Sequence, residues 1–177
     1  MKYLVIAAVL FFSQWNVADC PNPEKIRETN VKFKSENFLV STKGWEVMYA
    51  YGSHAIPFLL ANLDDDSRYY GLCGAGILKS QAIDSRKVKD KNNYPDDYYE
   101  ITVRDASLYL ILAILRGDLY FAGNCEPHCS EGKLDFAFKA ATKLIRERYV
   151  EYLKGEVSFE YKDVTDILSS CRISYKQ

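Results

Sequence analysis

This 177-residue sequence contains little histidine, and the net charge of the chain is close to zero. The two histidines, His54 and His128, are far apart in the chain, and neither lies in a recognisable catalytic motif. A formal net charge of −1 gives no basic excess of the kind that nucleic-acid-binding domains use, so we expect no nucleic-acid partner. No apolar run after the first twelve residues approaches the length of a membrane span, so we also expect no span.

The one pronounced apolar run lies at the start of the chain. Lys2 precedes LVIAAVLFF at residues 4–12, and a polar stretch follows that ends in small residues at Ala18. This layout is typical of a secretory signal peptide. We therefore predict a signal peptide over residues 1–18 and a single exported domain, periplasmic or secreted, over residues 19–177.

A different processing of the same segment gives a different localisation. If Cys20 were the lipidated first residue of the mature chain, the protein would be a lipid-anchored envelope protein. Asp19 occupies the position before that cysteine, where a small residue is wanted. The sequence therefore favours the secreted form over the anchored one.

Export makes disulfides the default role for cysteine. The candidates are Cys20, Cys73, Cys125, Cys129 and Cys171, and because their number is odd, one stays free, pairs between chains or is acylated. Cys125 and Cys129 flank His128 in CEPHC, but zinc needs a second ligand pair that is not nearby. We expect disulfides, either Cys125 with Cys129 or each with a distant cysteine, and neither a metal nor a cofactor.

Apolar residues recur at helical spacing along most of the exported chain, which predicts a mainly α, compact helical domain with little or no strand. Thr102 and Asp105 stand in the spacing of a capping box, and the helix they begin is apolar nearly all round, so it should be the most buried. The predicted helices cover residues 22–31, 42–52, 53–63, 102–117, 134–155 and a last turn at 163–168, with a short strand at 157–161.

Residues 67–101 show no regular pattern and form a long insertion between two predicted helices. Insertions of this length inside a compact domain are usually functional or disordered. A basic run is followed by NNYPDDYYE, and tyrosine with charge on an exposed loop suits a protein-contact surface. The alternative is that the tyrosines of the insertion pack down on the helices. The predicted partner-binding residues are Tyr94, Asp96, Asp97, Tyr98, Tyr99 and Glu100.

Two segments on either side of this insertion resemble the helix pair of a HEAT-like repeat. The first is AIPFLLANLDD at residues 55–65, and the second is VRDASLYL at residues 103–110. No second copy of the pair is visible, so the flanking helices must cover it. The resemblance implies a compact domain with one HEAT-like pair at its centre, and a protein-binding scaffold in place of catalysis.

Our main hypothesis is an exported, non-enzymatic protein-binding domain, and its most specific form is a periplasmic immunity or inhibitor protein that neutralises a toxin or enzyme. The alternative is a secreted hydrolase with Cys73 as nucleophile and His54 as base, or a metal-dependent one that uses the CEPHC loop. The acids at residues 64–66 lack the spacing of a calcium loop, so we interpret them as solvated turn residues.

Overall fold

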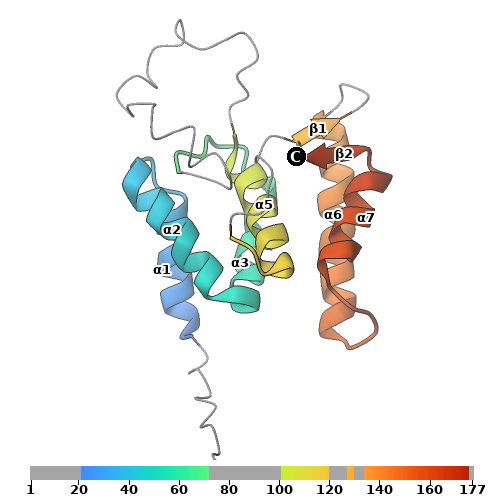
Figure 1. Ribbon diagram of the computed structural model, residues 1–177, viewed down its shortest axis with the longest axis horizontal. Helices are drawn as coiled ribbons and strands as arrows, with labels where there is room; N and C mark the ends of the chain where they lie inside the picture. Colours follow the sequence, from blue (N-terminus) through green and yellow to red (C-terminus); the bar gives the residue numbers. More distant parts are fainter. Residues whose placement is uncertain (1–20, 72–100, 120–126, 130–133, 176–177) are drawn as a thin grey trace, which may run out of the picture.

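In the computed structural model, residues 21–71, 101–119, 127–129 and 134–175 are described, and they are mainly helical (Figure 1). The only strands within these ranges are two short ones, which confirms a mainly α fold with almost no strand. The helices are α1 (Pro23–Phe33), α2 (Phe38–Ala50), α3 (Ile56–Ala61), α5 (Val103–Arg116), α6 (Leu134–Leu153) and α7 (Tyr161–Ser170), with 3₁₀ turns η1 (Gly52–Ala55) and η2 (Asn62–Asp64). The strands β1 (Pro127–Cys129) and β2 (Ile173–Tyr175) pair antiparallel.

Helix α5 is the central helix of the domain. Every residue from Val103 to Ala113 is buried, which confirms the prediction of a most buried helix. The predicted capping box is present in both directions: Thr102 accepts a hydrogen bond from the Asp105 amide, and Asp105 accepts one from the Thr102 amide. Gly117 ends α5 in the left-handed conformation (φ 73°), which glycine adopts without steric cost.

The starts of α2 and α7 were predicted at the wrong residues, because in both helices a polar capping residue, and not the apolar pattern, sets the start. Helix α2 begins at Phe38, before the predicted residue 42, because Asn37 accepts a hydrogen bond from the Val40 amide at 3.1 Å. The predicted strand at residues 157–161 is absent. There α7 begins at Tyr161, because the Asp163 carboxylate accepts a hydrogen bond from the Glu160 amide and caps the helix.

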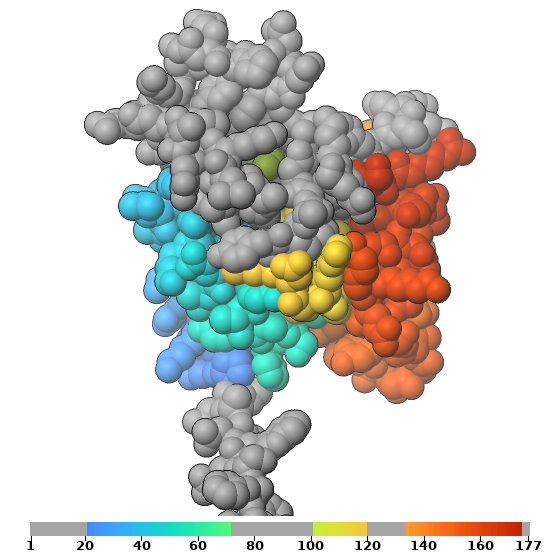
Figure 2. Space-filling model, viewed as in Figure 1, coloured from blue at the N-terminus to red at the C-terminus, as the bar shows by residue number. Residues whose placement is uncertain are grey.

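The helices are arranged as two groups with α5 between them (Figure 1). Helices α1 and α2 pack closely against each other on one side, while α6 and α7 form the other side together with the strand pair. Figure 2 shows the same order on the surface, from blue and cyan through yellow to orange and red. Helix α3 and η2 pack against α5. The two HEAT-like segments are therefore neighbours in space, and their resemblance to a repeat family stays a prediction.

Candidate functional site

The two ends of the predicted insertion are hydrogen-bonded to each other. The Tyr69 amide donates to the Ile101 carbonyl at 2.8 Å, and the Val103 amide donates to the Ser67 carbonyl at 2.8 Å. Between these bonds Arg68 and Thr102 form an antiparallel bridge. We call residues 67–71 and 101–103 the stem. The stem brings the chain back to α5 beside the point where it left α3.

Tyr69 fixes the stem to the helical core. Its side chain is buried, and its ring packs against Phe33 and Trp45 with ring centroids 5.1 and 6.3 Å away. The Tyr69 hydroxyl is hydrogen-bonded to Ser41, whose own hydroxyl donates to the Phe33 carbonyl at 2.6 Å. Burial raises the pKa of Tyr69 well above its usual value, and the hydrogen bond with Ser41 opposes part of that rise. The tyrosine therefore stays neutral and holds the stem between α1 and α2.

Gly71 is the last described residue before the insertion, and it lies directly against this anchor. A Cβ atom at Gly71 would overlap the Tyr69 hydroxyl and would lie 2.6 Å from Ser41 Oγ. Glycine therefore allows the backbone to approach the buried hydroxyls closely. Beside it, the Arg68 guanidinium lies over the half-buried Tyr70 ring at 5.3 Å. Of the two stem tyrosines, one packs into the core and the other faces the surface.

The acidic turn that precedes the stem joins three separate parts of the fold. Each aspartate of the 64–66 turn is paired with a cation from a different element. Asp64 and Asp66 remain largely exposed, in agreement with the interpretation as turn residues, but their cations give them a structural role that the sequence did not predict. The pairs are Asp64 with Arg146 at 2.8 Å, Asp65 with Lys34 at 3.4 Å, and Asp66 with Arg104 at 2.6 Å.

Arg104 is the most buried of these cations, with a side chain only 7% exposed. Besides Asp66, its guanidinium lies 3.5 Å from carboxylate oxygens of Asp105 and of Asp135, and 4.6 Å from the centre of the Phe138 ring. A buried arginine with charged partners and an aromatic face ties the stem and α5 to the start of α6. Sequence reasoning missed this residue, although a charge inside a nearly all-apolar helix was a signal for it.

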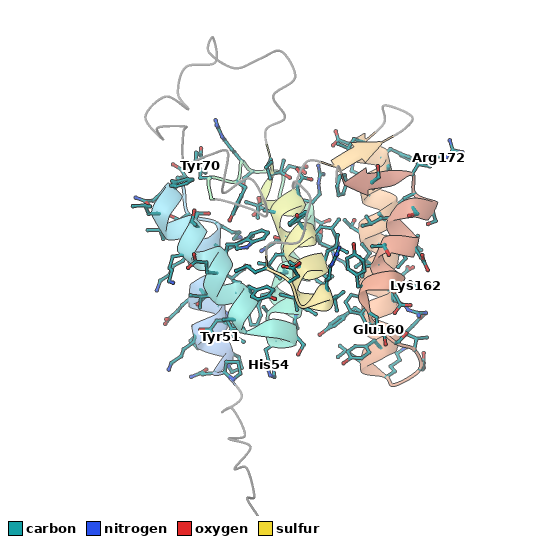
Figure 3. All side chains as sticks on the ribbon, in the orientation of Figure 1. Tyr51, His54, Tyr70, Glu160, Lys162 and Arg172 are labelled. Carbon is teal, nitrogen blue, oxygen red and sulfur yellow. The ribbon has the colours of Figure 1, made fainter. Side chains whose placement is uncertain are left out.

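The proposed catalytic and metal-binding residues are not brought together in the part of the chain that the structure describes. Within residues 21–71, 101–119, 127–129 and 134–175, no group of three or more histidine, cysteine, aspartate or glutamate residues is placed to hold a metal ion. His54 is exposed in η1, at the end of α2 opposite to Ser41 and the stem, and Figure 3 shows His54 and Tyr70 at opposite ends of the molecule. Cys73, its proposed nucleophilic partner, lies outside the described residues.

The predicted contact residues of the insertion also lie outside the described part of the chain, so their role stays a prediction. They are Tyr94, Asp96, Asp97, Tyr98, Tyr99 and Glu100. The same holds for Cys20 and Cys125. Cys171 is a free, half-buried thiol at the end of α7, and the backbone of Cys129 lies in β1.

No helix among the described residues combines the length and apolar character that crossing a membrane requires. No family model, no curated protein and no solved structure matches this chain.

Proposed function

We propose that the chain is an exported protein-binding domain without catalytic activity, which presents residues 72–100 to a partner from a helical body. A periplasmic immunity or inhibitor protein, which neutralises a toxin or an enzyme, is the most specific form of this proposal. The observation that carries it is the stem: the direct hydrogen bonds between its two sides hold both ends of a 29-residue segment at one place on the core. Segments held in this way by a rigid body are frequent sites of binding.

The stem makes the helical body independent of the length of the insertion. The Tyr69 amide bonds directly to the Ile101 carbonyl, so a connection much shorter than residues 72–100 would be enough to join α3 to α5. Tyr69 itself is anchored on α1 and α2, and Arg104 is anchored on α6. Residues 72–100 are longer than the connection between α3 and α5 requires. A contact with another molecule explains this extra length better than packing on the helices alone.

The residue types of the segment indicate the kind of partner. Its basic residues lie at positions 79–91, and three of its five acids lie at positions 96–100 beside three tyrosines. Tyrosine supplies apolar area with a hydrogen-bonding group, and flanking carboxylates favour a basic surface through electrostatic complementarity. We therefore propose a partner with a basic face that receives residues 94–100.

Capture experiments on a stem-preserving variant test this proposal. In the variant, a flexible Gly/Ser linker of about six residues replaces residues 72–100. The immobilised wild-type chain is expected to retain a specific protein from an extract of the exported fraction, and the variant is expected to lose it. Circular dichroism and a cooperative thermal transition establish that the variant is folded.

Two further variants separate the contact residues from the body. Replacement of Tyr94, Tyr98 and Tyr99 by alanine should weaken capture at least tenfold, because central aromatic contacts dominate interface energies. The matched control is Phe136→Ala, which removes a 76% exposed aromatic ring from α6 and should leave capture unchanged. Equal retention of the same protein by the linker variant would show that the body, and not the insertion, makes the contact.

A further inference from the structure

The outer face of α6 carries four charged residues whose signs are grouped along the helix. They occupy consecutive i,i+4 positions, two bases and then two acids: Lys139, Lys143, Glu147 and Glu151. We call these four residues the charged row. Residues four apart lie on the same side of a helix, and all members of the row are exposed. Buried residues of α6 such as Ile145 occupy the opposite side. The charged row therefore faces away from the core.

The order of these charges is unfavourable for a helix that meets only water. Like charges four residues apart repel each other, and the row contains a pair of lysines and a pair of glutamates at this spacing. The ion pair within the row joins Lys143 to Glu147 at 3.9 Å with the lysine first, which is the weaker of the two orientations. Glu151 lies in the last turn of α6, where a negative charge opposes the helix dipole. Solvation alone does not account for this order.

A second copy of α6 that runs antiparallel to the first matches the order at every position. A two-fold axis at the level of Ile145, the middle of the row, places Lys143 beside Glu147 of the second copy and Lys139 beside Glu151 of the second copy. In the commonest class of helix packing, with axes crossing at about −50°, the i,i+4 rows of two helices run alongside each other. A parallel copy would instead place lysine beside lysine. The charge order therefore selects the antiparallel arrangement.

Exposed apolar residues flank the charged row. Leu144 is 40% exposed and Val150 is 50% exposed, and each lies three residues from Glu147, so both border the middle of the row. Contact with a second copy would remove part of this apolar surface from water. Two crossing helices bury less than the roughly 1,200–2,000 Å² of a standard protein interface, so the association should be weak.

We propose that the outer face of α6 binds the same face of a second copy of this chain, antiparallel, through the charged row. The product is a weak dimer in which the Lys139–Glu151 and Lys143–Glu147 pairs each form twice between the copies. Helices α1 and α2, which hold the stem, lie on the other side of α5 (Figure 1). The inference is independent of the proposed function, because it concerns only self-association through α6.

Charge-reversal variants of the whole protein test the proposal. Lys139→Glu with Lys143→Glu gives a row of four acids, and Glu147→Lys with Glu151→Lys gives a row of four bases. Sedimentation equilibrium at low salt, from about 10 µM to about 1 mM, covers the range of weak association. The wild type should dimerise, and each variant alone should show a dissociation constant at least tenfold larger, because like charges then face each other. An equimolar mixture of the two variants should dimerise again, since every acid then faces a base.

A variant with all four substitutions is the matched control. Its charge order is reversed and again self-complementary, and its net charge stays at −1, so it should dimerise with itself but not with the wild type. Sodium chloride at about 0.5 M should weaken the dimer, because it screens the ion pairs. A wild type that stays monomeric over the whole range would overturn the proposal. So would single-sign variants that associate as the wild type does, a mixture that associates no better than either variant alone, or a monomeric four-substitution variant.

Discussion

Helix α2 crosses the end of α1 in close backbone contact at Gly44. A Cβ atom at this position would overlap the Phe33 amide nitrogen and would lie 2.6 Å from Phe33 Cα and 2.9 Å from the Lys32 carbonyl carbon. All three atoms belong to the backbone of α1, so no side-chain rotation can make room. The substitution Gly44→Ala therefore requires the two helices to separate.

The expected cost follows from two opposing contributions. Carbon atoms need roughly 0.8 Å more than the 2.6 Å separation to reach an ordinary contact, and helix separation opens the packing of Phe33 against Trp45. Overpacking of this kind costs about 1–3 kcal/mol, and we expect the upper end because the obstacle is backbone. Alanine in place of glycine returns about 1 kcal/mol of helix propensity. We expect a net loss of about 2 kcal/mol in the free energy of unfolding.

Urea unfolding followed by circular dichroism measures this loss, and thermal unfolding should show a midpoint lower by about 4–8 °C. Lys43→Ala is the matched control, because Lys43 is the preceding residue of α2 and its side chain is 72% exposed, so its loss should change stability by less than about 0.5 kcal/mol. A Gly44→Ala protein as stable as the wild type would refute the close crossing and, with it, the placement of Ser41 against the stem.

Two further predictions concern the buried polar groups. Arg104→Met should lower the free energy of unfolding in urea by about 3 kcal/mol, because it removes a cation beside the fully buried Asp105 carboxylate. Asp135→Asn, at the exposed partner of Arg104, should cost less than about 0.5 kcal/mol. Equal effects of the two substitutions would contradict the structure. Burial, together with the nearby Tyr161 and Asp118, raises the pKa of Tyr109 to about 12. Above pH 10 the tyrosine of the unfolded chain loses its proton while that of the folded chain keeps it, so the free energy of unfolding should fall as the pH rises. Tyr109→Phe should reduce the slope of stability against pH by at most about 1.4 kcal/mol per pH unit, and an unchanged slope would refute the assignment.

The helical body was largely predictable because its signals are local. The apolar pattern and the Thr102–Asp105 spacing located α5, since a capping box requires only residues that are close in the sequence. The start of α2 at Phe38 was missed because its cap, Asn37, lies outside the apolar pattern. The start of α7 was placed at Asp163 because that acid was expected to begin the helix, whereas it caps the helix from its third position. Alternation at residues 157–161 suggested a strand. Of the apolar residues there, only Phe159 is buried, and it lies in a loop before α7.

The features that position the insertion were not predictable from local pattern, because they join residues far apart in the chain. The Tyr69–Ser41 hydrogen bond and the three ion pairs of the acidic turn depend on which helices meet, and a single sequence does not reveal this. Tyr69 was assigned to the insertion together with the tyrosines of the predicted contact surface, and the alternative that the tyrosines of the insertion pack down on the helices holds for this one. Its position two residues before Gly71 was the only sequence signal for a close, buried approach.

Under the proposed binding role, a stem of this kind would lower the cost of binding through the segment it carries. Bringing together the two ends of a 29-residue connection costs about 3 kcal/mol in chain entropy. In this chain the burial of Tyr69 and the backbone bonds of the stem offset that cost during folding, so it does not subtract from the affinity for a partner. The same 29 residues attached at one end only would explore a larger volume and would bind more weakly through identical contacts. The anchoring of both ends is therefore the property of the fold that most directly favours a binding role for residues 72–100.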